Sequence, residues 1–135
     1  MRIIGIDYGL ARIGSAIWDS QADLVLPLGV IAERDFKRAV SAVAGLCLEE
    51  RADLVVVGLP KRLSGEGTGE QVGRTERFVA ALRDETGLPI EMEDERMTSG
   101  VAESQRRHAK PGQVAERDAL AAVAILESHV RRGIR

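Results

Sequence analysis

Apolar positions in the first third of the chain form three short runs separated by turn-forming residues. The first begins at Ile3 and ends at Gly9, and the others cover residues 15–19 and 24–32. Short runs that contain β-branched residues and are bounded by glycine and polar residues are typical of strands. Their short connections predict an antiparallel meander. Pro27 cannot donate a backbone hydrogen bond, so we expect the third strand to lie at an edge or to contain a bulge.

From Asp35 onward the apolar residues recur at helical spacing. Residues 36–48 predict an amphipathic helix, and Asp35 stands near its start, where aspartate is favoured. The unbroken apolar run 54–58 then predicts a strand buried on both faces. A helix followed by such a strand indicates a parallel crossover.

Helices and one further strand fill the second half. The expected elements are a helix over 71–86, a strand over 88–95, a helix over 99–107 with Thr98 as its N-cap, and a last helix over 116–131. Gly87 stands where a left-handed C-terminal cap belongs. The glycine-rich residues 61–69 predict a surface loop that is either a flap over a substrate or a solvated connector.

Composition narrows the class of protein. The 135 residues suit one domain, and 44% apolar with 30% charged residues is typical of a globular protein. The net charge of −2 provides no global basic field of the kind that many nucleic-acid binders have. The single cysteine, Cys47, excludes an internal disulfide and is expected in the core. With no membrane-spanning run and no signal-peptide pattern, we expect a cytoplasmic location.

Asp7 is the first candidate for chemistry. Successive strand residues point to opposite faces, so Gly5 and Asp7 share one face of the first strand. A glycine inside a strand predicts that another element approaches this face closely. Asp7 either presents a carboxylate at the end of a buried strand or caps a turn by accepting a hydrogen bond from a nearby backbone amide.

Asp118 is the second candidate. It shares one face of the last helix with Ala121 and Ala122, whose small side chains allow close packing on a sheet. The face that carries Gly5 and Asp7 is a natural partner, and this packing would bring two carboxylates to one end of the sheet. Alternatively, Asp118 is an acid that the helix dipole favours in a first turn.

Carboxylates held together stay ionised when a cation is bound between them. Oxygen ligands without a cysteine or histidine cluster point to Mg²⁺ or Mn²⁺. A pair of such ions, about 3.5 to 4 Å apart, can activate a water and stabilise the leaving oxygen of a phosphodiester. The pattern therefore indicates phosphoryl chemistry.

Four segments together resemble the successive motifs of one family. They are Ile4-Gly5-Ile6-Asp7-Tyr8-Gly9 with Arg12-Ile13-Gly14, Val56-Val57-Gly58-Leu59-Pro60 with Ser64-Gly65, Asp94-Glu95-Arg96-Met97-Thr98, and Asp118-Ala119-Leu120-Ala121-Ala122. In this order they look like the motifs of the YqgF (RuvX) family, and they span nearly the whole chain.

The resemblance implies an α/β ribonuclease H-like fold over residues 1–135, related to the RuvC Holliday junction resolvases. Its mixed five-stranded sheet, three antiparallel strands then two parallel ones, is flanked by helices. It also implies a two-metal-ion endonuclease with Asp7, Glu95 and Asp118 as catalytic and metal-binding acids and with Mg²⁺ or Mn²⁺ as cofactor. The implied partners are precursor ribosomal RNA, matured at its 5′ end, or branched DNA; the oligomeric state, monomer or homodimer, stays open.

This sequence departs from the family pattern at two places. The strand that ends in Gly58 lacks the metal-binding glutamate of related resolvases, so Glu95 would take that role. Glu93, Asp94 and Glu103 are alternatives for a further acid. The segment before Asp118 is also less basic than in many members of the family.

Six basic residues near the expected site are candidate phosphate contacts: Arg12, Lys61, Arg62, Arg96, Arg106 and Arg107. Contacts of this kind supply sequence-independent affinity that falls with salt.

Two other classes of protein share parts of this pattern. Asp7-Tyr8-Gly9 resembles the first phosphate loop of the actin-like ATPases and sugar kinases, but their fold needs two lobes and a second phosphate motif. A catalytically weak nucleic-acid-binding or ribosome-assembly module with the same fold is the stronger rival. Three clustered acids favour the nuclease, because a pure binder of a polyanion has no use for them.

Overall fold

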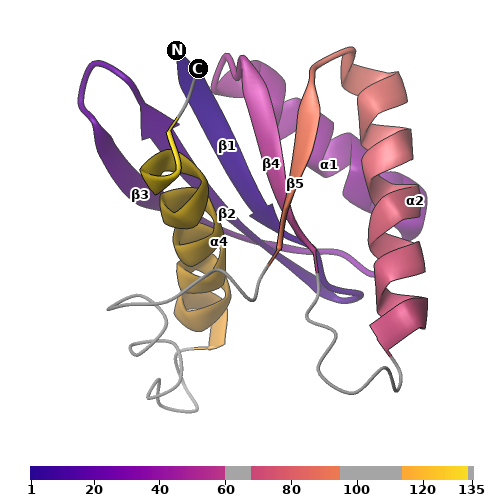
Figure 1. The fold of residues 1–135 in the computed structure, drawn as a ribbon. Coiled ribbons are helices and arrows are strands. Elements are labelled where there is room, and N and C mark those ends of the chain that lie inside the picture. Colours follow the sequence, from indigo (N-terminus) through magenta and orange to yellow (C-terminus); the bar gives the residue numbers. More distant parts are fainter. Residues whose placement is uncertain (60–67, 95–113, 134–135) are drawn as a thin grey trace.

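The computed structural model describes residues 1–59, 68–94 and 114–133, and these form a five-stranded sheet with helices on both faces (Figure 1). In chain order the elements are β1 (Arg2–Asp7), β2 (Arg12–Asp19), β3 (Leu24–Ala32), α1 (Phe36–Glu49), β4 (Leu54–Leu59), α2 (Thr68–Thr86), β5 (Ile90–Asp94) and α4 (Val114–Arg131).

The sheet is mixed, as the sequence predicts. Its strand order is β3-β2-β1-β4-β5. Strands β1, β2 and β3 pair antiparallel, whereas β4 pairs parallel with β1 and β5 pairs parallel with β4. The edge position expected for the strand that contains Pro27 is confirmed, and the β2–β3 register shifts between Ser15 and Ala16.

Element boundaries differ from the sequence-based expectations at several places, and β5 begins at Ile90 rather than at residue 88. Strand β2 begins at Arg12 rather than at residue 15, because Arg12 pairs with Ala32 of β3 and Gly14 pairs with Asp7 of β1. Helix α2 includes Gly69, which the glycine pattern assigned to a loop. Helix α4 begins at Val114, two residues early. The helix expected over 99–107 lies outside the described residues.

Two predicted helix caps are confirmed. The Asp35 carboxylate accepts a hydrogen bond from the backbone N–H of Arg38 at 3.0 Å and so caps the start of α1. Gly87 follows α2 with φ of +71°, and its N–H donates to the carbonyl of Arg83 at 2.9 Å. A left-handed residue just past a helix satisfies carbonyls that have no partner inside the helix.

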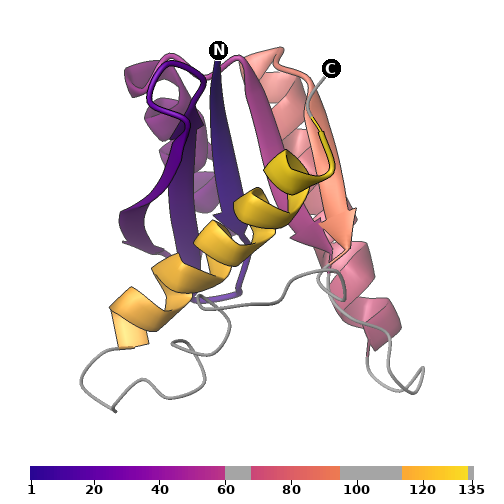
Figure 2. The same cartoon turned by 60° about the vertical axis from the view of Figure 1, so that its left-hand side comes forward.

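The two faces of the sheet bury different helices (Figure 2). On one face, Ile4, Ile6 and Val57 pack with α1 and α2, and Cys47 is buried there as expected. Burial raises the pKa of the Cys47 thiol to about 11. The opposite face packs against α4, which runs diagonally from the β2 side to the β5 side (Figure 2).

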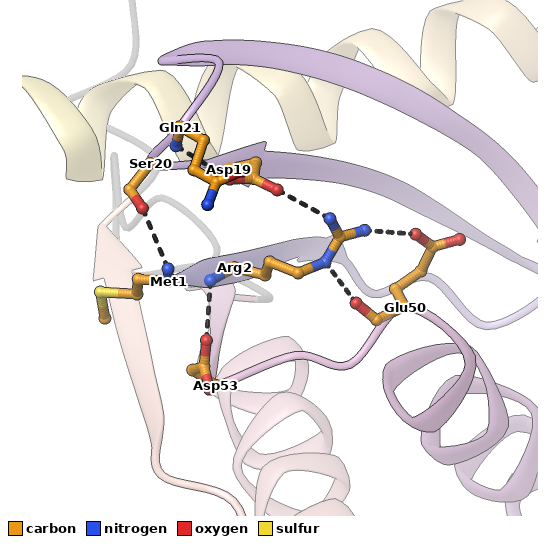
Figure 3. A network of polar contacts seen from close by, with 7 residues as sticks. All are labelled: Met1, Arg2, Asp19, Ser20, Gln21, Glu50 and Asp53. Carbon is orange, nitrogen blue, oxygen red and sulfur yellow. Dashed lines mark hydrogen bonds and ion pairs between the residues drawn. The ribbon is translucent and has the colours of Figure 1, made fainter.

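A polar network ties the start of β1 to its neighbours (Figure 3). The Arg2 guanidinium donates to Asp19 Oδ2 at 2.7 Å, to Glu50 Oε1 at 2.9 Å and to the Glu50 carbonyl at 2.5 Å. The Arg2 backbone N–H donates to Asp53 Oδ2 at 2.8 Å, and the Met1 ammonium donates to Ser20 Oγ at 2.9 Å. This network lies at the opposite end of β1 from Asp7.

Candidate active site

Asp7 is the last residue of β1 and lies on the face that packs against α4. Its neighbours in the strand show this, because Ile3 packs in the α4 core whereas Ile4 and Ile6 pack in the other. In the antiparallel ladder Asp7 pairs with Gly14 of β2, so their Cα atoms lie about 4.5 to 5.5 Å apart. The half-buried carboxylate therefore stands at the end of the central strand.

Helix α4 approaches this face closely at Gly5, as the sequence predicts. A Cβ atom at Gly5 would lie 2.9 Å from Leu126 Cβ and 3.1 Å from the carbonyl oxygen of Ala122. Ala122 is fully buried at this contact. A larger residue at either position would separate the helix from the sheet.

A still closer contact occurs at Gly14, where the start of α4 meets β2. A Cβ atom at Gly14 would lie only 2.0 Å from the carbonyl oxygen of Asp118. Only glycine allows this approach, because no side chain fits in the gap. Since Gly14 is the cross-strand partner of Asp7, the contact brings Asp118 to the same end of the sheet as Asp7.

Arg12 contacts the second of these acids directly. Its Nε–H donates to Asp118 Oδ2 at 2.8 Å, and the side chains are 50% and 22% exposed, respectively. Arg12 and Gly14 lie two residues apart in β2, so their side-chain positions share the face toward α4. The sequence predicts Arg12 as a candidate phosphate contact but does not indicate this ion pair, whose partners are 106 positions apart.

Tyr8, directly after Asp7, points to the opposite face. Its ring stacks on Phe78 of α2, with ring centroids 4.2 Å apart. Burial raises the pKa of the Tyr8 hydroxyl, while Arg74 and Arg77 act in the opposite direction. The stacked ring anchors the chain just beyond Asp7 and helps to fix the end of β1.

Most of the other candidate residues lie outside the described residues. They are Glu95, Glu103, Lys61, Arg62, Arg96, Arg106 and Arg107. Within residues 1–59, 68–94 and 114–133, no group of three or more His, Cys, Asp or Glu side chains could hold a metal ion. The described part of the site therefore consists of Asp7, Asp118 and Arg12.

Glu93, one alternative for a further acid, has a different environment. It is fully buried, and it accepts hydrogen bonds from Ser128 Oγ at 2.9 Å and from Arg132. His129 Nδ1 lies 3.7 Å from the same carboxylate. Ser128 is ten residues beyond Asp118, about 15 Å along the helix axis. Glu93 thus binds the C-terminal part of α4 rather than joining Asp118.

Asp94, another of these alternatives, pairs with Leu59 at the end of β5. Strand alternation places it on the face opposite to Glu93, away from α4.

No described helix is long and apolar enough to cross a membrane.

Comparison with known proteins identifies relatives over nearly the whole chain. The model of the family described as "RuvX: Holliday junction resolvase" matches residues 1–132. A Chloroflexus aggregans protein named "Putative pre-16S rRNA nuclease" is 40% identical over 131 residues, which are 95% of this chain and 92% of the relative. A Thermus thermophilus protein of the same name is 33% identical, with 99% of this chain and all of the relative covered.

Solved structures show the same fold. Thermus thermophilus RuvC in complex with a Holliday junction aligns with a TM-score of 0.64 and 18% identity, over 98% of this chain and 96% of that one. The fowlpox virus Holliday junction resolvase aligns with a TM-score of 0.60 and 12% identity, over 99% of this chain and all of that one. The chain therefore has a ribonuclease H-like fold and belongs to the RuvX family of nucleases and resolvases.

Proposed function

We propose that this chain is a metal-dependent endonuclease that hydrolyses phosphodiester bonds in structured nucleic acid. The observation that carries the proposal is the contact between Gly14 and the backbone of Asp118. It brings Asp118 beside the cross-strand partner of Asp7, so that acids from β1 and α4 stand at one end of the sheet. Glu95, which directly follows Asp94 of β5 in the sequence, is proposed as the third acid.

Two carboxylates at one end of a sheet fit a hard divalent cation, because oxygen donors are the ligands that Mg²⁺ and Mn²⁺ prefer. Asp7, Asp118 and Glu95 would hold it. When bound, such ions supply an activated water as nucleophile and a Lewis acid that stabilises the developing charge on the phosphate.

The chain's own residues orient these groups. Gly5 and Gly14 let α4 lie against the sheet, which fixes the backbone of Asp118 relative to β1. The stacking of Tyr8 on Phe78 fixes the other side of the strand end. A site held by close backbone packing positions its carboxylates more accurately than one on long loops.

Two substrates fit the relatives' names, precursor ribosomal RNA and branched DNA. Both are polyanions, and basic side chains would bind their phosphates. The proposed phosphate contacts are Arg12, Lys61, Arg62, Arg96, Arg106 and Arg107. None of them reads a base in this proposal, so substrate choice would follow the shape of the nucleic acid.

The test compares Asp7→Asn with wild type on a labelled four-way DNA junction and a labelled ribosomal RNA precursor leader, each with Mg²⁺, Mn²⁺ or EDTA. We expect Asp7→Asn to lower the cleavage rate on the order of 10³-fold, because it removes a ligand charge and changes little in shape. Asp84→Asn, the same change at an exposed position of α2, should cut like wild type.

The substrate that is cut identifies the role of the enzyme. Equal cleavage by Asp7→Asn and wild type would contradict the proposal. Tight binding of either substrate without any metal-dependent cleavage would favour the alternative, a catalytically weak nucleic-acid-binding or ribosome-assembly module.

A further inference from the structure

We propose that Arg12 is a positioning residue that holds the Asp118 carboxylate in place of a metal ion and turns to a nucleic-acid phosphate when the site is loaded. This inference rests on the proposed function, because it concerns the same acids. It adds a property that the acids alone would not have: metal binding and nucleic-acid binding are coupled through one guanidinium.

The geometry of β2 and α4 forces Arg12 and Asp118 together. Gly14 lies two residues beyond Arg12 on the same strand face, and the start of α4 lies directly on it. The Arg12 side chain therefore projects toward the first turns of α4, where its Nε–H reaches Asp118 Oδ2 at 2.8 Å. Backbone packing brings the two residues into contact, so the ion pair is not a chance encounter of two long side chains.

The guanidinium is only partly used in this contact. Half of the Arg12 side chain is exposed, and within residues 1–59, 68–94 and 114–133 its two terminal nitrogens have no bonded partner. Arginine presents its N–H groups in a rigid fork that matches the oxygens of a phosphate. A phosphate at the edge of the site could therefore bind Arg12 beside the acid.

The positive charge of the Arg12 guanidinium beside Asp118 opposes the binding of a metal ion by that carboxylate. The guanidinium neutralises charge that would otherwise attract the ion, and it repels the ion across a short distance. A polyanion that draws Arg12 toward its phosphate would relieve both effects. Nucleic acid should then tighten metal binding, and by thermodynamic reciprocity metal should tighten nucleic-acid binding by the same factor.

The competing interpretation is a structural ion pair that merely helps to anchor α4. Exposed pairs of this kind contribute little to stability. Under this interpretation, removing Arg12 would leave metal affinity unchanged or weaken it through loss of order. The two interpretations thus differ in the sign of one measurable effect.

The experiment measures Mn²⁺ binding by calorimetry, without substrate, for wild type, Arg12→Gln and Arg12→Lys. We expect Arg12→Gln to bind Mn²⁺ about five- to tenfold more tightly than wild type, because an opposing cation is gone. Arg12→Lys, which keeps the charge, should stay close to wild type. Arg38→Gln is the matched control, since it removes the same charge from the exposed surface of α1 on the opposite face of the sheet.

A second measurement in EDTA follows binding of an uncleaved four-way DNA junction at several salt concentrations. Arg12→Gln should bind more weakly, with a slope of log affinity against log salt that is smaller by about one. Repeating the Mn²⁺ titration with the junction present should show a gain in affinity for wild type that is reduced in Arg12→Gln. Arg12→Ala should reproduce each result if Arg12→Gln folds poorly.

The outcomes separate this inference from the proposed function. If wild type fails to bind Mn²⁺, or if Asp118→Asn binds it as well as wild type, the proposed metal site is wrong and the inference fails with it. If wild type binds Mn²⁺ and Asp118→Asn does not, the site stands. Unchanged or weaker Mn²⁺ binding by Arg12→Gln would then overturn the inference alone.

Discussion

The two ends of the sheet both carry an arginine at the first residue of a strand, and they use it differently. Arg2 at the start of β1 bonds Asp19, the Glu50 carboxylate and the Glu50 carbonyl, so all three of its guanidinium nitrogens have partners (Figure 3). Arg12 at the start of β2 donates to Asp118 through Nε, and its two terminal nitrogens have no partner among the described residues.

The two arginines differ in how many of their guanidinium nitrogens have a hydrogen-bond partner among the described residues. The Arg2 side chain is 35% exposed and pairs with two carboxylates, whereas Arg12 is 50% exposed and pairs with one carboxylate in the part of the chain that the structure describes. At the Arg2 end, side chains join β1, β2 and the end of α1. At the Asp7 end, close backbone packing at Gly14 holds β2 and α4 together.

The largest effect is expected from Gly14→Ala, which disrupts the close backbone contact between β2 and α4. Its Cβ would lie 2.0 Å from the carbonyl of Asp118, so α4 must shift. We expect the free energy of unfolding in urea to fall by about 3 kcal/mol. Gly45→Ala is the control: nothing lies within 4 Å of that Cβ on α1, and the helix should gain about 0.5 to 1 kcal/mol. Wild-type stability of Gly14→Ala would mean that α4 does not rest on β2.

Smaller effects are expected from substitution of the two arginines, and these effects should differ in kind. Arg2→Gln should lower the free energy of unfolding by about 1 kcal/mol, because several partly buried contacts are lost, and should leave the cleavage rate unchanged. Arg12→Gln should change stability by less than about 0.5 kcal/mol while altering Mn²⁺ and junction binding. Urea unfolding and the cleavage assay measure both. Equal losses of stability in the two variants would remove the distinction between the ends.

The smallest expected effect is on the stability of the fold at acidic pH. The pKa of Asp19 is lowered, chiefly because its carboxylate accepts a hydrogen bond from the backbone N–H of Gln21 and further because Arg2 binds it. A carboxyl whose pKa is lower in the folded state stabilises the fold above its unfolded pKa. This contribution is lost as pH falls below about 4, through the folded pKa.

Asp19→Asn should therefore unfold more readily than wild type at pH 7, with a difference that shrinks toward pH 3. Thermal unfolding across this range measures it. A difference that grows as pH falls would have the wrong sign for a lowered pKa and would assign the stabilisation to another group.

Much of the fold could be predicted because it depends on local periodicity. Short apolar runs bounded by turn residues predicted the strands, helical spacing predicted α1, α2 and α4, and Pro27 indicated an edge position or a bulge for β3. Gly5 predicted the approach of α4, because a glycine weakens a β-branched strand and is favoured there where another backbone packs closely against it.

The position of Gly14 against α4 could not be predicted from the local sequence. The expected start of the second strand at residue 15 left Gly14 in the preceding turn, whereas it lies inside β2 and, of the described glycines, allows the closest approach of α4. The turn interpretation fits a glycine near a strand end equally well, and only the tertiary position of Asp118 distinguishes the two. A glycine at alternate spacing from Arg12, on the face toward the last helix, is the signal that would have found it.

The partners of charged residues could not be predicted for a similar reason. Arg12 meets Asp118, and Glu93 meets Ser128 and Arg132, across 106, 35 and 39 positions of sequence. Charge alone allows many such pairs, and the diagonal path of α4 across the sheet selects these (Figure 2). The sequence around Glu93 does not indicate its burial against α4, which separates it from Asp118.

The most direct test of the metal site is a crystal structure of wild-type protein soaked in Mn²⁺, with anomalous diffraction recorded to locate the ion. A peak within coordination distance of both the Asp7 and the Asp118 carboxylates is expected, with the Arg12 guanidinium moved away from Oδ2. Mn²⁺ bound elsewhere, with Asp7 and Asp118 unliganded and Arg12 still on Asp118, would contradict the assignment of these acids as the metal site.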